Sequence, residues 1–367
     1  MATDEKHPRV ALLANIPAPY RVPVYDRIAA RLGSSFKVIY MAQLERNRKW
    51  RVPDLGHDHV YLHGVTVGWG ARHVHVRFGV LAELRAFDPD VVITAGFNPP
   101  MVASWLYARA AGKKHVPMSD AWVGSEASLS ALHRQLRRWV FSTSHAFIGA
   151  SLQTLQLFKS YGIERNLFRS CLSVDNSRFT SVAGPIAERP YDLVFSGSLI
   201  EGKLPLFFTD VVRLVSARLA TVSVLVIGDG ELRARMERAL ADLPNVRTRF
   251  TGYLQQAELP AAYVQGKVFC FPTRNDAWGI VANEACAAGM PVVTCTNAGC
   301  AAELIVHGHN GYVLPLAPGV WADHIIRLLR DRALLAEMSR CSTRSVAEYT
   351  YDHAASGILA ACAVSSP

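Results

Sequence analysis

The chain has 367 residues, of which 50% are hydrophobic and 19% are charged. This length favours two domains, and the composition excludes a disordered chain. No apolar run approaches the ~18 residues that span a bilayer, and the polar stretch 1–9 does not resemble a signal peptide. The seven cysteines include no CxxC pair, which predicts reduced thiols. We therefore expect a cytoplasmic protein and not a fibrous, integral membrane or Sec-exported one.

Positive charge is concentrated in the first half of the chain. The net charge is +9, and residues 1–180 contain 23 Lys and Arg against 13 Asp and Glu. Two basic clusters flank tryptophans: Arg46, Arg48, Lys49 and Arg51 around Trp50, and Arg134, Arg137 and Arg138 before Trp139. The first half is therefore expected to present a basic surface.

The second basic cluster is expected to lie on an amphipathic helix. Apolar residues recur there at helical spacing, at Leu129, Leu132, Leu136 and Val140. Three interpretations remain open: a solvated basic face, an anionic membrane surface with tryptophan as interfacial anchor, and nucleic-acid binding. The sequence has no helix-turn-helix, RNA-binding or zinc-finger signature, so we expect no nucleic-acid partner.

Short apolar runs that end at Gly or Pro alternate with helical patterns along the chain. Strands are expected at 10–15, 36–41, 90–94, 115–118, 146–150, 191–195, 223–227, 246–251, 267–272 and 291–295. Helices are expected at 22–32, 101–111, 204–219, after the Gly turn 228–230, and at 279–288, 320–331, 334–341 and 351–362. This alternation predicts an α/β protein with buried parallel sheets.

The alternation breaks once, at 175–190, where periodicity is weak. The expected parts are an N-terminal Rossmann-like domain over 1–179, a C-terminal Rossmann-like domain over 188–348 and a C-terminal helix within 349–367. We expect the two domains to face a cleft, with ligands outside the carboxyl ends of the strands.

The segment 271–293 is the richest in chemistry. Trp278 and Gly279 mark a turn into a helix, whose first N–H groups and dipole suit an anion such as a diphosphate. Glu284 lies more than a turn inside that helix, and its carboxylate can accept the two hydrogen bonds of a ribose diol. Asp276, on the preceding loop, can reach sugar hydroxyls.

This segment resembles the signature of the retaining, nucleotide-sugar-dependent glycosyltransferases of the GT-B fold, the glycosyltransferase family 4 type. That signature is Pro-Ser-x-x-Glu-x-Phe-Gly, a second Glu eight positions after the first, and Ala-x-Gly-x-Pro-Val. The matching residues are Pro272-Thr273, Asp276, Trp278-Gly279, Glu284, Ala287 and Gly289-x-Pro291-Val292. Further matches are Ser196-Gly197-Ser198 with Gly202-Lys203, and the stretches 227–231, 250–253 and 297–313. The resemblance covers about half of the chain, mainly 146–315.

The resemblance implies transfer of a hexose from a UDP- or GDP-sugar with retention of configuration, without metal or other cofactor. It implies that Glu284 binds the ribose, that Asp276 holds the donor sugar, and that Lys203 neutralises the leaving diphosphate. Such a preorganised cation favours the transition state most, because negative charge develops there. The remaining residues assigned to the donor side are Gly197, Ser198, Arg274, Trp278, Gly279 and Ile280.

The chain departs from the family pattern at two charged positions. Asp276 replaces the usual Glu and is one methylene shorter, and Ser198 replaces an Arg that usually accompanies the phosphate-binding Lys. Arg274 and Arg21 are the candidates that supply the missing cation.

The acceptor side is expected in the first domain. Where the family often has a Gly-Gly loop, this chain has 15–21, which resembles a subset with a Pro-Tyr-Arg stretch. Asn15, Tyr20 and Arg21 are therefore assigned to the acceptor side. Asp120 follows the expected strand 115–118, where the family often has a His in the cleft, and is a candidate catalytic residue for contact with acceptor or donor. The resemblance also implies that the last helix packs back on the first domain.

These features predict a glycosyltransferase with a nucleotide-sugar donor and a glycan or lipid-linked acceptor, in bacterial polysaccharide or glycolipid assembly. An anionic membrane surface is a further candidate partner, through peripheral attachment at its inner face. Two alternatives stay open: a GT-B sugar-nucleotide epimerase or phosphorylase, and a degenerate nucleotide-sugar-binding protein without turnover.

Five histidines lie close together in the sequence, at positions 57, 59, 63, 73 and 75. No fixed set of acids or cysteines accompanies them, so we expect exposed histidines and no metal site.

Overall fold

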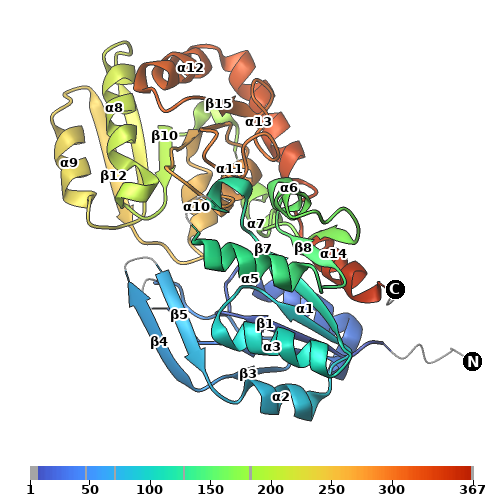
Figure 1. The fold of residues 1–367 in the computed structure, drawn as a ribbon. Coiled ribbons are helices and arrows are strands. Elements are labelled where there is room, and N and C mark those ends of the chain that lie inside the picture. The colour runs from blue at the N-terminus through green and yellow to red at the C-terminus, as the bar shows by residue number, and fades with distance from the viewer. Residues whose placement is uncertain (1–6, 46–47, 70–71, 127–128, 182–183, 365–367) are drawn as a thin grey trace, which may run out of the picture. The chain divides into compact units, whose positions relative to one another are not determined.

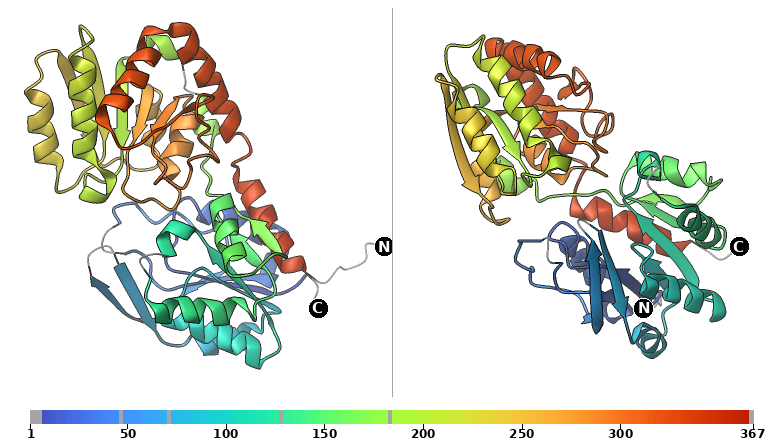
Figure 2. Two further views of the ribbon diagram at one scale, coloured as in Figure 1. Left: turned by 45° about the horizontal axis from the view of Figure 1, so that its top comes forward. Right: turned by 60° about the vertical axis from the view of Figure 1, so that its left-hand side comes forward.

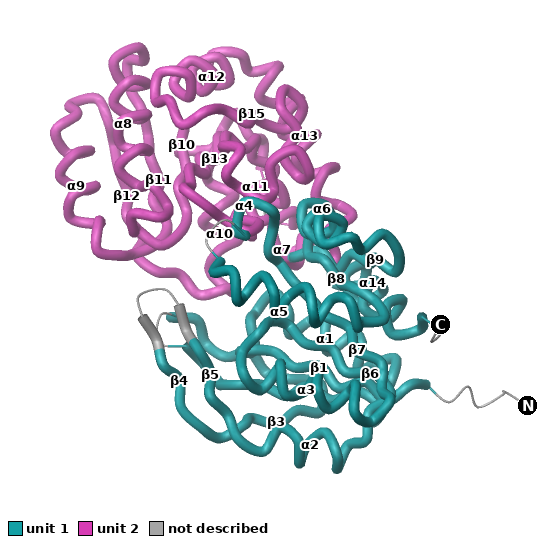
Figure 3. The backbone as a smooth tube through the Cα atoms, viewed as in Figure 1, with its two compact units in different colours: residues 1–173, 351–367 teal, residues 174–350 magenta. Residues whose placement is uncertain are grey.

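The computed structural model describes residues 7–45, 48–69, 72–126, 129–181 and 184–364. These residues form two compact units (Figure 3). Unit 1 comprises residues 1–173 and 351–367, and unit 2 comprises residues 174–350. Residues 174–179, which the sequence analysis assigned to the first domain, therefore group with unit 2.

Unit 1 contains a parallel sheet with the strand order β3-β2-β1-β6-β7-β8-β9 (Figure 1). Its strands are β1 Val10–Ala14, β2 Phe36–Tyr40, β3 His59–Tyr61, β6 Val91–Thr94, β7 Lys114–Ser119, β8 Phe147–Gly149 and β9 Leu167–Arg169. The central strands β1 and β6 are buried along their whole length, which explains why they are uniformly apolar and do not alternate.

Helices pack against both faces of this sheet (Figure 2). They are α1 Val22–Leu32, α2 Val80–Phe87, α3 Pro99–Ala110, α4 Val123–Glu126, α5 Ala131–Phe141, α6 Leu152–Ser160 and α14 Tyr351–Ala363. The last of these, α14, packs on α1, β8 and β9. Gly357 permits this contact, because a Cβ there would lie 1.8 Å from the Arg169 carbonyl oxygen. An ion pair of 3.0 Å between Arg27 and Asp352 ties the two helices together.

An antiparallel hairpin, β4 Gly64–Trp69 and β5 Arg72–Arg77, extends unit 1 and was not expected from the sequence. Its residues Val65, Val67 and Val74 are exposed, so the hairpin lacks the buried apolar run by which the sheet strands were found.

Unit 2 is a second parallel sheet, in the order β12-β11-β10-β13-β14-β15. Its strands are β10 Tyr191–Ser196, β11 Val222–Ile227, β12 Val246–Gly252, β13 Gly266–Phe271, β14 Val292–Thr294 and β15 Gly311–Val313. Its helices are α7 Ser177–Thr180, α8 Pro205–Ser216, α9 Arg233–Ala241, α10 Leu259–Tyr263, α11 Ile280–Ala287, α12 Pro318–Arg330 and α13 Arg332–Val346. α8 packs beside α9 and α12, and α11 packs on α13.

In each sheet the first strand in the chain is central. The strands that follow it lie successively further out on one side, and the later strands lie on the other side. In unit 1 the direction reverses between β1 and β6, and in unit 2 it reverses between β10 and β13. In sheets of this kind the loops diverge at the reversal, and ligands bind there, outside the carboxyl ends of the strands. Two Rossmann-like units, as expected from the sequence, therefore each offer one such place.

The amphipathic helix expected at the second basic cluster is α5, with Val140 in the core and Leu132 78% exposed. One expectation about side chains needs correction. His57 and His75, expected to be exposed, are buried and satisfied, because His57 bonds to Asp26 and Tyr40 and His75 bonds to Glu45.

All seven cysteines are buried and unpaired with one another. None of the helices within the described ranges is both long and apolar enough to cross a bilayer.

Candidate functional sites

The first candidate site lies where β10 and β13 end in unit 2. The strands are neighbours and parallel, so the loops 197–204 and 272–279 leave the sheet side by side. They are joined by hydrogen bonds to the Gly202 carbonyl oxygen, from the Arg274 N–H at 3.0 Å and the Thr273 hydroxyl at 3.2 Å. The two segments that resemble the donor-binding motifs therefore form one surface.

Small residues bring a third loop against the first. The N–H of Gly197 donates to the Ile227 carbonyl oxygen at 2.9 Å. A Cβ at Gly228 would lie 2.0 Å from the Gly197 carbonyl oxygen, and one at Gly230 would lie 2.5 Å from that of Leu199. The Gly turn at 228–230 thus holds the loop after β10 in place by close backbone contact.

Lys203 and Asp276 form an ion pair across the two main loops. The Lys203 side chain is 32% exposed and that of Asp276 is 17% exposed, so both remain accessible. The second oxygen of Asp276 accepts the Trp278 N–H at 3.2 Å. Leu204, which follows Lys203 directly, has a left-handed backbone with φ of 53°, a costly conformation for this residue type that occurs at functional sites.

The start of α11 is shaped by Gly279. Its φ is 92°, and a Cβ there would lie 2.2 Å from the Phe271 ring. Trp278 is buried, and its indole N–H donates to the Asn283 side-chain oxygen at 2.7 Å. These contacts fix the turn. The N–H groups of Ile280 and Val281 at the start of α11 have no acceptor within the helix, whereas the Ala282 N–H donates to the Gly279 carbonyl oxygen at 2.8 Å.

Glu284 is buried inside unit 2, at 3% exposure. One of its carboxylate oxygens accepts the Tyr263 hydroxyl at 2.6 Å, and Arg178 is close enough to act on it electrostatically. Burial raises the pKa of Glu284 to about 7, although the Tyr263 hydrogen bond and Arg178 both act to lower it. Around neutral pH this carboxyl group is therefore only partly ionised.

The two positions linked to the missing cation are both exposed. Ser198 lies on the loop after β10, and Arg274 lies on the loop after β13, where its guanidinium is 3.4 Å from Glu201. Arg274 thus lies on the same surface as Lys203 but already has an acidic neighbour.

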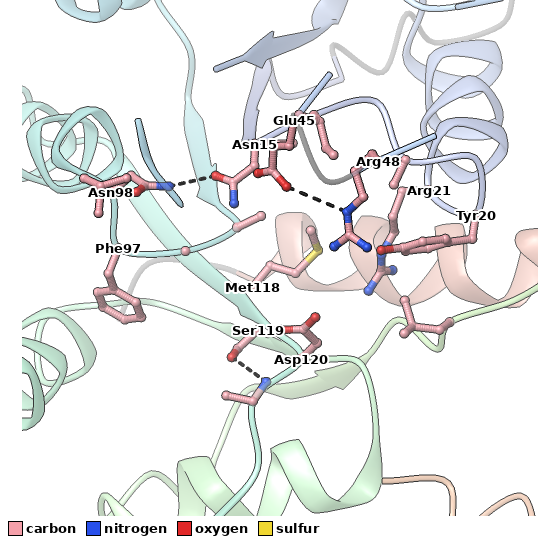
Figure 4. Close-up of a pocket in the computed structure, with 18 of the residues that line it drawn as sticks. Asn15, Tyr20, Arg21, Glu45, Arg48, Phe97, Asn98, Met118, Ser119 and Asp120 are labelled. Atoms are coloured by element: carbon pink, nitrogen blue, oxygen red, sulfur yellow. Dashed lines mark hydrogen bonds and ion pairs between the residues drawn. The ribbon is translucent and has the colours of Figure 1, made fainter. Parts of the chain in front are cut away.

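The second candidate site is a cavity of about 660 Å³ in unit 1. It is lined at the ends of β1, β6 and β7, by Asn15, by residues 95–99 and by Ser119 and Asp120. This is the place where the strand order of unit 1 reverses, so the geometry meets the condition for a ligand site. Figure 4 shows Tyr20, Arg21 and Asp120 around it.

Arg21 is the buried cation of this cavity. It directly precedes α1, is 8% exposed, and donates to the Ser170 carbonyl oxygen at 3.2 Å and to the Ser170 hydroxyl at 3.1 Å. Tyr20 lies beside it, and burial raises the pKa of the Tyr20 phenol, with Asp120 acting in the same direction. The three residues assigned to the acceptor side and Asp120 all line one cavity.

Several residues shape the cavity without having been found from the sequence. The Asn98 amide donates to the Asn15 side-chain oxygen at 2.9 Å. Glu45 bonds to His75 at 3.1 Å and lies 3.8 Å from Arg48. Asn98 precedes a Pro-Pro helix start, a capping signal that could have pointed to it, whereas the Glu45–His75 contact depends on the hairpin and has no local signal.

The histidine of β7, His115, does not line the cavity. It lies within β7 and is buried, bonded to Thr94 at 3.0 Å and to Ser144 at 2.8 Å. Burial lowers its pKa to about 3, so it is neutral at physiological pH. Over the described residues, no group of three or more His, Cys, Asp or Glu is arranged to hold a metal ion.

Comparison with solved structures identifies the fold. The chain resembles Anabaena Alr3699/HepE, solved in complex with UDP and glucose, over 96% of this chain and 98% of that one, with a TM-score of 0.72 at 16% identity. It also resembles sucrose-phosphate synthase from Thermosynechococcus elongatus over 95% and 96% of the chains, with a TM-score of 0.71 at 14% identity. The chain has the fold of a GT-B glycosyltransferase. The expectation drawn from the motifs is confirmed at this level.

Sequence relatives agree with the GT-B assignment. Residues 190–331 match the family of glycosyl transferases group 1. The chain is 28% identical over 285 residues to a GDP-mannose-dependent alpha-mannosyltransferase of Mycobacterium tuberculosis, covering 72% of this chain and 71% of the relative. It is 29% identical over 148 residues to the sulfoquinovosyl transferase SQD2 of Arabidopsis thaliana, covering 39% and 28%. It is 32% identical over 109 residues to a D-inositol 3-phosphate glycosyltransferase of Salinispora arenicola, covering 28% and 23%. The match thus spans about a quarter of the length of these last two relatives.

The residues assigned to the donor side form two groups in unit 2. Lys203 and Asp276, each assigned by resemblance to a motif, pair across the loops that follow the neighbouring strands β10 and β13. The partner of Glu284, by contrast, is Tyr263 at the end of α10, a tyrosine that no motif distinguishes from others in the chain.

Proposed function

We propose that the chain is a retaining glycosyltransferase that moves a hexose from a UDP- or GDP-sugar to a glycan or lipid-linked acceptor. One observation carries the proposal: the Lys203–Asp276 pair lies beside the start of α11 at the strand reversal of unit 2, within the segment that matches group 1 glycosyl transferases. A cation, a carboxylate and helix N–H groups at one place suit a diphosphate that carries a sugar.

The donor site is proposed to work as follows. The diphosphate binds at the N–H groups of Gly279 and Ile280 and draws Lys203 away from its carboxylate partner. Asp276, thus released, binds hydroxyls of the donor sugar and stabilises positive charge at the anomeric carbon as the glycosidic phosphate bond breaks. Lys203 neutralises the leaving diphosphate, whose oxygen takes the proton of the attacking acceptor hydroxyl. The transition state then benefits most, since both charges are largest there.

Glu284 is proposed to accept hydrogen bonds from the ribose hydroxyls. Its raised pKa makes this contact dependent on pH, because only the ionised carboxylate accepts two such bonds well. The site as proposed needs no metal ion, since Lys203 supplies the positive charge.

Unit 1 is proposed to bind the acceptor, in the cavity lined by Asn15, Tyr20, Arg21 and Asp120.

An anionic membrane surface is proposed as a partner of α5 in the same unit. On that helix Trp139 is 53% exposed and Leu132 is 78% exposed, and Arg138 is exposed between them. Exposed Trp and Leu with Arg suit the interface of an anionic bilayer, where the rings insert and the cations meet headgroups. Bacterial polysaccharide or glycolipid assembly is the setting in which these features would act together.

A thermal-shift panel tests the proposal. The full-length protein is titrated with UDP-, GDP-, ADP- and dTDP-sugars, with EDTA in every well. A ligand at about 100 times its Kd adds about 2.7 kcal/mol of stability, so one nucleotide series should stand out. Product analysis with the selected donor alone separates transfer from epimerisation, which would change the donor without an acceptor. Stabilisation without any product, with or without acceptor extract, would indicate a binding protein.

A further inference from the structure

The cavity of unit 1 contains a buried cation without an acidic partner. Arg21 is 8% exposed, and both of its hydrogen bonds go to neutral oxygens of Ser170. Among the described residues, no carboxylate oxygen lies within 4.0 Å of this guanidinium, the distance that defines an ion pair. A charge in such surroundings is normally paired, because the loss of water is otherwise not offset. Arg137, which also lines the cavity, follows this rule and pairs with Glu126.

A second cation lies at the same end of the cavity. Arg48 is exposed, stands 5.0 Å from the centre of the Trp50 ring, and lies 3.8 Å from Glu45, a loose contact. Tyr20, Arg21 and Arg48 all line the cavity, and the two arginines lower the pKa of the Tyr20 phenol against the larger effect of burial. Figure 4 shows Arg21 and Arg48 directed into the same space beside Tyr20.

Hydrogen-bonding groups for a sugar ring complete the cavity. Asp120 is exposed at the end of β7, and Asn15 is held by Asn98. A carboxylate and an amide oxygen accept hydrogen bonds from hydroxyls, whereas the planar arginine fork suits the oxygens of phosphate or carboxylate. One cavity thus combines an anion-binding end with a hydroxyl-binding wall.

We infer that this cavity binds a phosphate or carboxylate group through Arg21 and Arg48, as part of a phosphorylated or acidic sugar. The inference deepens the proposed function, since on that proposal the acceptor carries the anionic group. The same chemistry has a second source, the diphosphate of the donor, which the test distinguishes.

The test compares the full-length wild-type protein with Arg21→Gln, Arg48→Gln and the control Arg31→Gln. Arg31 is exposed near the end of α1 and does not line the cavity, so it matches the charge change only. The probes are inorganic phosphate, glucose 6-phosphate, glucuronate, uncharged glucose, UDP and GDP. The Kd of each probe is measured by calorimetric titration. For glucose 6-phosphate we expect binding to weaken at least about tenfold in both cavity variants, as for loss of one charge-assisted contact, and to be unchanged in the control.

The pattern over the probes identifies the source of the anion. Weakening of glucose 6-phosphate and glucuronate, with UDP and GDP unaffected, assigns the site to an acceptor. Weakening of UDP or GDP alone assigns it to the donor diphosphate. Equal binding of every anionic probe by the wild type and both cavity variants overturns the inference.

Stability separates a binding role from a structural one. If Arg21 serves to bind an anion, the melting temperature of ligand-free Arg21→Gln should be higher than that of the wild type or lower by no more than about 2 °C. A melting temperature more than about 5 °C lower assigns Arg21 to holding Ser170, and Arg48→Gln, on an exposed loop, then decides the inference alone. Neither measurement requires sugar transfer, so a chain that binds these anions but transfers no sugar refutes the proposed function and leaves this inference standing.

Discussion

On the proposal that Glu284 binds the ribose, its contact with Tyr263 sets how donor binding depends on pH. The Tyr263 hydroxyl donates to the carboxylate at 2.6 Å, and the pKa of Glu284 is about 7 with this bond in place. Tyr263→Phe keeps the ring, which stacks on Phe269 at 5.6 Å, and removes only the donor. Loss of a hydrogen bond to a charged group, about 1.5 kcal/mol, raises the pKa by about one unit.

The expected change in affinity follows directly. At pH 7 the ionised fraction of Glu284 falls from about half to about one tenth, so nucleotide affinity should fall about fivefold. At pH 9 the carboxyl group is mostly ionised in both proteins, and the difference should nearly vanish. Calorimetric titration of the stabilising nucleoside diphosphate between pH 6 and 9 measures both values. Tyr312→Phe, a buried tyrosine of the same unit, is the control. A loss of affinity that is the same at pH 7 and pH 9 refutes the reasoning.

Four further predictions concern other parts of the molecule. Gly279→Ala should cost clearly more stability than Gly308→Ala in denaturant unfolding, because both have positive φ, worth about 1–2 kcal/mol, but only the first brings a Cβ against a ring. The pKa of Glu284 is about 7 in the folded protein and 4.5 ordinarily, so the wild type loses stability as the pH rises from 4.5 to 7. Over that window the free energy of unfolding of Glu284→Gln should rise by about 3 kcal/mol relative to that of the wild type. Free energies of unfolding that run parallel with pH in the two proteins would contradict this. Lys203→Ala should lower kcat about 10²–10³-fold with a smaller change in nucleotide Kd, measured by turnover and titration. Trp139→Ser should reduce sedimentation with anionic vesicles several-fold and leave the weak binding to zwitterionic vesicles unchanged.

The fold could be predicted from local patterns because its central strands are buried on both faces. β1, β6, β11 and β13 are short apolar runs ending at Gly, Pro or a polar turn, and each was located to within one or two residues. The hairpin of β4 and β5 was not predicted, because its valines are exposed and do not form the short apolar run of a buried strand.

The candidate sites could be predicted only as far as they lie on strand ends. Lys203 and Asp276 were both assigned to the donor side by resemblance to two family motifs, and the structure pairs them. Contacts between segments distant in sequence had no signal: Ser170 holds Arg21 across 149 positions, and Tyr263 reaches Glu284 from another helix. The burial that shifts the pKa of Glu284 is likewise a property of the packed unit and not of the helix pattern.

In the proposed mechanism, Lys203 stabilises a nucleoside diphosphate as it leaves a donor sugar. The most direct test is the rate of nucleoside diphosphate release from the nucleotide sugar that best stabilises the protein, in the presence of EDTA and an acceptor extract, for wild type and Lys203→Ala. We expect release coupled to a glycosylated product of retained anomeric configuration, and a rate at least about a hundredfold lower in the variant although it still binds the nucleotide. Equal rates in the two proteins would contradict it.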